Sequence, residues 1–211
     1  MTAPGRMGRP PLSKERKAEI RLEIARAAVD LFAAQGVAAT TGEQIGQAVG
    51  VSARTVWRYF PSKEACVRPL FAAGIEAIAD VLRRWPPDRP LEDVVGSVLS
   101  TDNRLVRGPD RATMVSLVRL TRSEPSLRAE WLQSYDTAEP AFARALAERS
   151  GLPADALVPT IQAAMVNAAL RAAIEHYAWR VADGATDTAT AEAELTATMR
   201  AALAVVADGL A

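Results

Sequence analysis

The chain has 211 residues, of which 49% are hydrophobic and 24% charged, and its 25 basic and 25 acidic side chains cancel. This composition indicates an ordinary soluble globular protein, and the length allows one large or two small domains. The single cysteine, Cys66, excludes an internal disulfide and fits a reducing cytoplasm. We see no apolar run near the length of a membrane span and no signal peptide, so we expect a cytoplasmic protein without a membrane partner.

The zero net charge hides an asymmetry along the chain. Residues 1–68 carry a net charge of +5 and residues 69–211 a net charge of −5, and all three lysines lie in the basic part. Such a distribution favours an electropositive, nucleic-acid-binding N-terminal part on an acidic body.

Residues 1–12 are rich in Pro and Gly and carry Arg6 and Arg9, so we expect a disordered basic arm. Two interpretations stay open: a tail without a role, or an arm whose arginines enter the minor groove of DNA. A long helix is predicted next, from Ser13 to Gln35, with an apolar stripe along one face and Gly36 at its end.

Residues 41–63 have the pattern of two short helices joined by a tight turn. Thr41 can cap the first helix, because its hydroxyl can accept an otherwise unpaired backbone N–H. Gly50 follows at the helix end, where a left-handed backbone favours glycine. Ser52 then caps the second helix. The order of cap, glycine and cap predicts a helix-turn-helix.

The second short helix has an apolar face and a cationic face. Val56 and Phe60 are four residues apart and share one face, and Arg54 and Arg58 fall near the opposite pole. Arginine can pair bidentately with the edge of guanine, so this helix is suited to a major groove. Lys63 follows in the first turn of the next helix, where a cation fits beside an external phosphate. The alternative, a hairpin with a solvated arginine face, explains single residues but not their combination.

Residues 24–64, IARAAVDLFAAQGVAATTGEQIGQAVGVSARTVWRYFPSKE, resemble the N-terminal domain of TetR-family transcriptional regulators. The resemblance implies an all-helical, homodimeric, ligand-responsive regulator, most often a repressor. By position it implies phosphate contacts from Thr41, Tyr59 and Lys63. The positions that would read bases or flank them are Ser52, Ala53, Arg54, Thr55 and Trp57, to which the helical wheel adds Arg58. One departure is visible, because Gly42 replaces the larger residue usual at the start of the second helix.

The rest of the chain is predicted to be helical. A helix from Ser62 to about Arg84 contains Pro69, which we expect to bend it, either as a pivot or as a fixed kink. Abundant alanine and the absence of β-branched alternation predict further helices rather than strands, and Pro140 is expected to break or kink one of them. Their expected ranges are 91–101, 110–123, 125–149, 154–182 and 188–209. The predicted fold is therefore all-α, with an arm (1–12), a three-helix DNA-binding domain (13–62) and a helical ligand-binding and dimerisation domain (63–211).

The last two helices carry apolar seams that we interpret as a dimer surface, in line with the resemblance. Burial of both seams inside the subunit is the alternative. The residues assigned to this surface are Ile161, Ala168 and Ala172 in one helix and Leu195, Met199, Ala202 and Val206 in the other.

Aromatic and sulfur-bearing residues of the body are candidates for an apolar ligand pocket between helices. For each of them, plain core is the alternative. The candidate wall residues are Trp85, Met114, Trp131, Tyr135, Phe142, Met165, Tyr177 and Trp179. The candidate polar anchors are Arg119, Glu124, Asn167 and His176.

No catalytic constellation, phosphate-binding glycine loop or metal-ligand spacing is evident, so we expect no enzyme activity, no cofactor and no metal. We predict a homodimeric repressor that binds a palindromic operator in double-stranded DNA and is released by a small, largely apolar or aromatic effector. The alternatives are an activator or architectural DNA binder of the same fold without an effector and, more remotely, a helical enzyme or carrier.

Overall fold

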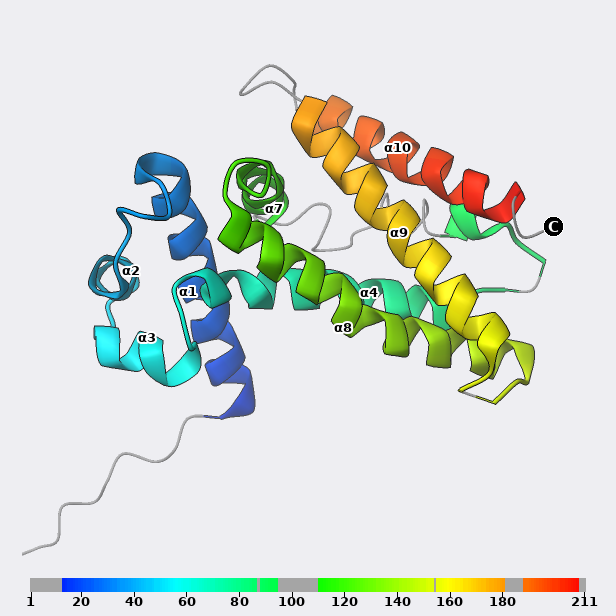
Figure 1. Cartoon of the computed structure of the whole chain (residues 1–211), viewed down its shortest axis with the longest axis horizontal. Coiled ribbons are helices and arrows are strands. Elements are labelled where there is room, and N and C mark those ends of the chain that lie inside the picture. The colour runs from blue at the N-terminus through cyan, green and yellow to red at the C-terminus, as the bar shows by residue number, and fades with distance from the viewer. Residues whose placement is uncertain (1–12, 87, 95–109, 154, 181–187, 209–211) are drawn as a thin grey trace, which may run out of the picture.

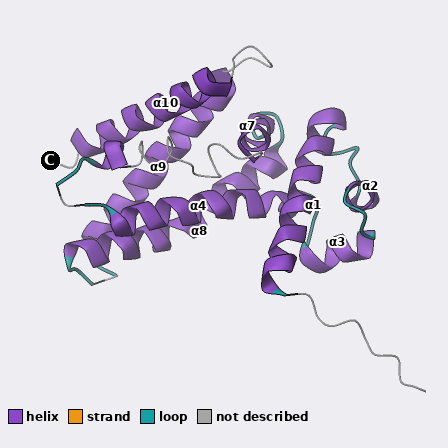
Figure 2. Ribbon diagram, turned by 180° about the vertical axis from the view of Figure 1, so that it is seen from behind, coloured by secondary structure: helices purple, strands orange, loops and turns teal. Residues whose placement is uncertain are grey.

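A computed structural model describes residues 13–86, 88–94, 110–153, 155–180 and 188–208. All regular structure in these ranges is helical (Figure 2), which confirms the predicted all-α class. The helix-turn-helix lies at one end of the molecule and the longer helices of the body extend from it (Figure 1).

The N-terminal domain contains α1 (Lys14–Gln35), α2 (Gly42–Ala48) and α3 (Ala53–Tyr59). The Arg16 N–H donates to Oγ of Ser13 at 3.2 Å, so Ser13 caps α1, which ends at the predicted Gln35. Gly36 ends α1 with φ 83°, a conformation that favours glycine. The apolar faces of the three helices meet in a core that includes Ile24, Phe32, Ile45, Val56 and Phe60.

The connection to the body differs from the predicted continuous helix. A short 3₁₀ helix, η1 (Glu64–Val67), precedes α4 (Arg68–Arg84), and Pro69 lies in the first turn of α4. The predicted bend at Pro69 is therefore wrong, because a proline in the first turn removes no helical hydrogen bond. Ser62 does accept the Ala65 N–H at 3.1 Å, but the turn that it caps is the 3₁₀ helix.

The body contains α7 (Asp110–Leu120), α8 (Pro125–Ser150), α9 (Leu157–Arg180) and α10 (Thr188–Asp208). α8 packs along α4, and α9 packs between α8 and α10 (Figure 1). α8 continues through Pro140, so the alternative in which this proline ends the helix is wrong. Of the helix expected at 91–101, residues 91–94 are helical and the remainder lies outside the described residues.

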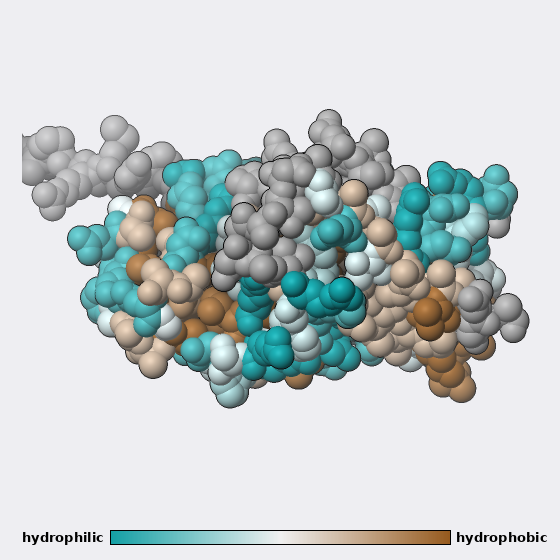
Figure 3. Space-filling view, turned by 90° about the horizontal axis from the view of Figure 1, so that it is seen from above, coloured by the Kyte–Doolittle hydropathy of each residue, from teal (hydrophilic) through white to brown (hydrophobic). Residues whose placement is uncertain are grey.

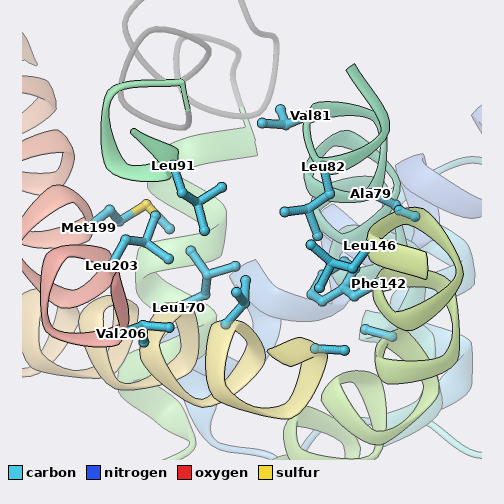
Figure 4. Close-up of a cluster of buried hydrophobic side chains, with 14 of the residues drawn as sticks. Ala79, Val81, Leu82, Leu91, Phe142, Leu146, Leu170, Met199, Leu203 and Val206 are labelled. Atoms are coloured by element: carbon cyan, nitrogen blue, oxygen red, sulfur yellow. The ribbon is translucent and has the colours of Figure 1, made fainter. Parts of the chain in front are cut away.

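Two apolar clusters hold the fold together. The first joins α4, α8, α9 and α10, and Figure 4 shows Met199, Leu203 and Val206 of α10 reaching towards Leu170 and Leu91. The second is centred on the three N-terminal helices but also contains Phe71 of α4 and Trp131 of α8. The core of the helix-turn-helix thus crosses residue 63, where we placed the domain boundary, and that boundary stays a prediction.

One described helix, α9, is long and apolar enough by length and composition alone to cross a membrane. The expectation that no such run exists is wrong. α9 packs against α7, α8 and α10, and it also exposes the apolar side chains of Leu157, Val158 and Ile161. A helix that is apolar all round is typical of a protein core or an interface as well as of a membrane.

Candidate functional site

The start of α2 is fixed by a reciprocal cap. The Gln44 N–H donates to Oγ1 of Thr41 at 3.3 Å, and the Thr41 N–H donates to Oε1 of Gln44 at 2.8 Å. This capping box satisfies two backbone donors that the first turn of a helix leaves open. Thr41 itself is exposed, so its hydroxyl lies at the surface beside the amino end of α2.

Two glycines shape the turn between α2 and α3. Gly50 has φ 69°, as its position at the end of α2 predicts. Gly46 was missed from the sequence: a Cβ there would lie 2.7 Å from the carbonyl oxygen of Val51, so only glycine lets the two helices approach this closely. A glycine inside a seven-residue helix was the available signal for this close approach.

Helix α3 presents its two arginines to solvent. Ser52 Oγ accepts the Thr55 N–H at 3.2 Å, and this cap orients the helix on the core through Val56, which is fully buried. Arg54 and Arg58 are exposed, and neither forms an ion pair within the described ranges. The Arg58 guanidinium lies over the half-buried ring of Tyr59, 5.1 Å from its centroid. The exposed face of α3 is therefore cationic, as the helical wheel predicts.

Trp57 lies on the flank of α3 and is 44% exposed. Its indole packs against the first turn of α2 at Gly42, where any larger side chain would overlap the ring. The other positions that the resemblance singles out, Ala53 and Thr55, are half-buried beside it. The arm residues Arg6 and Arg9 lie outside the described residues.

The ammonium group of Lys63 is occupied by hydrogen bonds within the protein, whereas the sequence predicts that it contacts a DNA phosphate. Its ammonium donates to the carbonyl oxygens of Val37 at 2.6 Å, Ala38 at 3.2 Å and Thr40 at 3.0 Å. These three hydrogen bonds tie the end of the helix-turn-helix to the loop between α1 and α2. A phosphate contact by Lys63 stays a prediction, and it requires the ammonium to leave or share these carbonyls.

A cavity lies in the body between α4, α7, α8, α9 and α10. Its walls include five of the eight predicted wall residues, namely Met114, Trp131, Tyr135, Phe142 and Tyr177. Leu195 and Met199 of α10 line it too, although the sequence assigned them to a dimer surface. The cavity walls are almost entirely apolar, which is typical of sites for small organic ligands.

The predicted polar anchors do not line this cavity. His176 is exposed beside Arg180, and the side chain of Arg119 donates to the carbonyl oxygen of Ala178 at 3.0 Å. Asn167 is buried, but its amide donates to the Tyr135 carbonyl at 2.9 Å and to Glu139 at 3.2 Å. These three assignments are wrong because a single sequence does not show which way a polar residue on a helix points. Glu124 precedes α8 and is also absent from the walls.

Three apolar candidates are corrected as well. The indole of Trp85 donates to the Arg89 carbonyl at 2.6 Å and stacks under Arg149, at the far end of α4. Met165 packs on the outer side of the body core, and Trp179 lies in a separate surface hollow with Arg119. None of them lines the cavity, because Trp85 follows the end of α4 and the other two point elsewhere from their helix.

A buried carboxylate next to the cavity was missed from the sequence. Glu175 receives hydrogen bonds from Arg128 at 2.5 Å and from the Trp131 indole at 2.7 Å, and Arg171 lies 3.5 Å away. The pair Arg171 and Glu175, four residues apart on α9, was the available sequence signal. The hydrogen bond to Glu175 fixes the Trp131 ring, and this ring lies between the charged cluster and the cavity.

The predicted dimer residues divide into two groups. Ile161, Ala168 and Ala172 of α9 are exposed on one face, while Leu195, Met199 and Val206 of α10 are buried in the subunit core (Figure 4), and Ala202 is half-buried. The α10 assignment is therefore wrong for the buried three. The exposed side of α10 carries Ala197, Ala201 and Val205 instead.

The described residues offer neither a metal site nor a reactive thiol. Across the described ranges no group of three or more His, Cys, Asp and Glu lies close enough to hold a metal ion. Cys66 is fully buried, and burial raises the pKa of its thiol to about 12, so it stays protonated near neutral pH.

Comparisons with known proteins agree with this arrangement. Residues 24–70 match the family model for bacterial regulatory proteins of the tetR family, and residues 89–211 match the model for the MftR C-terminal domain. The HTH-type transcriptional regulator TcmR of Streptomyces glaucescens is 34% identical over 151 residues, which is 69% of this chain and 67% of TcmR.

Solved structures share the fold along most of the chain. GusR of Salmonella enterica superposes with a TM-score of 0.53 and 22% identity, over 92% of this chain and 97% of GusR. FadR of Thermus thermophilus, a TetR-family repressor solved in complex with lauroyl-CoA, gives 0.51 and 19% over 90% and 95% of the two chains. The chain belongs to the TetR family of bacterial transcriptional regulators, with a helix-turn-helix DNA-binding domain at its N-terminus.

Proposed function

We propose that this regulator is a cytoplasmic homodimeric repressor that binds a palindromic operator and is released by a small, largely apolar or aromatic effector. One observation carries the release step. Phe71 and Trp131 line the body cavity and also belong to the core of the helix-turn-helix. A molecule that displaces these rings disturbs the packing that orients α3.

The DNA-facing residues support operator binding by two copies of α3. Arg54 and Arg58 provide the base contacts, with Ser52, Ala53, Thr55 and Trp57 around them, and Thr41 and Tyr59 provide phosphate contacts. One seven-residue helix offers few contacts, whereas two copies about one helical turn apart read both halves of a palindrome. Arg6 and Arg9 extend the contact into the minor groove.

The exposed apolar faces of α9 and α10 form the dimer surface. Leu157, Val158 and Ile161 of α9 and Val205 of α10 are exposed to between 47% and 73%, an unusual set of large apolar side chains for an isolated surface. Small residues follow them, at Ala168 and Ala172, and allow close approach of a partner helix. Figure 3 shows apolar surface at the end of the body opposite the helix-turn-helix, in addition to patches nearer to it.

In this proposal the free dimer populates a DNA-binding arrangement of its two α3 helices. The effector binds more tightly to an arrangement in which the two helices no longer match the half-sites. Only this difference in affinity shifts the equilibrium, and by linkage the operator must weaken effector binding by the same factor.

The experiment compares two matched surface changes. Ile161→Arg places a charge on the proposed dimer face, while Leu132→Arg places one at a similarly exposed apolar position of α8. We expect Ile161→Arg to give a monomer by analytical ultracentrifugation and to lose retardation of the DNA upstream of its own gene, while Leu132→Arg keeps both. A dimeric, fully DNA-binding Ile161→Arg protein would contradict the proposal.

A further inference from the structure

The walls of the body cavity carry aromatic rings and one hydroxyl without a partner. We propose that this cavity takes an uncharged aromatic molecule and holds it by a hydrogen bond between the Tyr135 hydroxyl and an oxygen or nitrogen of the ligand. The inference rests on the proposed function, because it specifies the effector of the same site.

No charged side chain lines the cavity within the described part of the chain. Outside the walls, Arg128 and Arg171 both pair with Glu175, which also accepts a hydrogen bond from the Trp131 indole. An ionised ligand group would therefore enter without a counter-charge, at a large desolvation cost. This argument excludes carboxylates, sulfonates and phosphates from the buried part of the ligand.

Aromatic rings define the shape of the cavity. The ring centroids of Trp131 and Tyr135 are 4.6 Å apart at 82°, an edge-to-face pair, and the Phe71 ring lies tilted by 56° with its centroid 4.9 Å from that of Trp131. Phe142 and Tyr177 contribute further rings. A flat aromatic molecule can extend this edge-to-face arrangement, which contributes beyond the burial of area alone.

The three hydroxyl groups on the cavity wall differ in whether they already have a hydrogen-bond partner in the protein. Oγ of Ser134 donates to the Trp131 carbonyl at 2.6 Å, and the Tyr177 hydroxyl donates to the Ala191 carbonyl at 3.0 Å. The Tyr135 hydroxyl makes no hydrogen bond to any residue that the structure describes. Tyr135 is half-buried and lines the cavity, so an atom of a bound ligand can supply the partner of its hydroxyl.

The protonation state of Tyr135 suits this role. Burial, and to a smaller extent the charge of Glu175, raises the pKa of the Tyr135 hydroxyl above its usual value. The phenol therefore stays neutral over the physiological range and keeps its proton for donation. A neutral donor can hold a ligand carbonyl or hydroxyl without introducing a charge.

Lauroyl-CoA, the ligand of the Thermus thermophilus structure, represents a different class. Its acyl chain is apolar, but its phosphates carry charges that this cavity has no group to receive. Only the chain of such a molecule fits the walls, and it would leave Tyr135 and the edge-to-face rings without a matching partner.

The test uses the full-length protein and three probes of one shape: naphthol, naphthalene and naphthalene sulfonate. By isothermal titration calorimetry we expect naphthol to bind about fivefold more tightly than naphthalene, and the sulfonate at least roughly a hundredfold more weakly than naphthol. Tyr135→Phe should remove the advantage of naphthol and leave naphthalene unchanged. Ser134→Ala, the matched loss of a wall hydroxyl that bonds its own helix, should preserve the ratio.

Three outcomes would overturn the proposal: no binding of any probe, a naphthol advantage that survives Tyr135→Phe, or sulfonate or lauroyl-CoA binding as tight as that of naphthol. Retardation of operator DNA is measured separately with each probe. A probe that binds as expected but does not release DNA contradicts the proposed function and leaves the ligand class standing. Release by lauroyl-CoA alone supports the proposed function and overturns the ligand class.

Discussion

The indole of Trp57 occupies the space that a side chain at Gly42 would fill. A Cβ at Gly42 would lie well inside van der Waals contact with Cζ2, Cε2 and Cη2 of the ring. Trp57 thus bridges the recognition helix α3 and the first turn of α2, while 44% of its surface remains exposed. The small residue at position 42, a departure from the family pattern, is explained by the large ring at position 57.

Gly42→Ala should displace the Trp57 ring without unfolding the domain, because the overlapping atoms belong to a side chain that can rotate. We expect a loss of operator affinity of roughly 1–3 kcal/mol, typical of an overpacked site. Gel retardation of the single variants Gly42→Ala and Trp57→Ala and of the double variant measures the coupling. Because both changes disturb one contact, the double variant should match Trp57→Ala within about 0.5 kcal/mol. Simple additivity would show that the ring has no such role.

Arg54→Ala and Arg58→Ala should each reduce operator affinity by about 1–3 kcal/mol and relax selectivity at one base pair of each half-site. The reason is the loss of a bidentate contact to a guanine edge. Binding to a panel of operators with single base changes measures the relaxation. Arg83→Ala, on the body and paired with Asp80, is the control and should leave the whole panel unchanged.

Lys63→Met separates two roles of this lysine. If its ammonium mainly binds the loop carbonyls of Val37, Ala38 and Thr40, the variant should lose about 1–3 kcal/mol of unfolding free energy. The slope of log affinity against log salt should then stay as in the wild type. A slope that decreases by about 0.9 instead, at unchanged stability, would indicate a direct phosphate contact.

Cys66 should make stability depend on pH in the alkaline range. Burial raises the pKa of its thiol from 9.0 to about 12 in the folded protein, so its contribution is complete below pH 9 and decreases as the pH rises towards 12. The difference in melting temperature between the wild type and Cys66→Ala should therefore narrow between pH 8 and pH 10.5, values chosen to span roughly the lower part of this range. A constant difference would show that the thiol does not titrate on unfolding.

Glu175→Leu should destabilise the protein by about 3–5 kcal/mol, because Arg128 and the Trp131 indole then lose a buried partner. Glu130→Leu is the matched change at a carboxylate whose partner, Arg68, is half exposed. It should cost no more than about 1 kcal/mol. Urea unfolding of the two variants measures both values, and equal losses would contradict the assignment of Glu175 as a buried anchor.

The sequence predicted the helix-turn-helix well because its signals are local. Thr41, Ser52 and Gly50 act within one turn of the chain, and each has the predicted cap or left-handed backbone. The close approach at Gly46 and the pairing of Gly42 with Trp57 depend on how two helices cross. No spacing along the chain specifies such a crossing.

The body was harder to predict for a related reason. α9 and α10 are apolar on more than one side, so Leu195 and Met199 fit a dimer surface as well as they fit the core that actually contains them. The residues that share their apolar cluster, Leu82 and Phe142 among them, come from helices far away in the sequence. Likewise Asn167 and His176 could be placed on α9, but the direction in which each points depends on tertiary packing.

The apolar cluster that runs from Ile24 through Phe71 to Trp131 has a consequence for engineering. A graft of residues 13–62 alone onto the body of another regulator would leave one side of α1 without its native neighbours on α7, where Leu117 and Val118 belong to the same cluster. The transplanted DNA-binding domain would need apolar residues of matching shape at these positions of the host body. A working chimera of this protein should therefore keep the apolar contacts between α1 and the body, and its junction should not be placed simply where the helix-turn-helix motif ends.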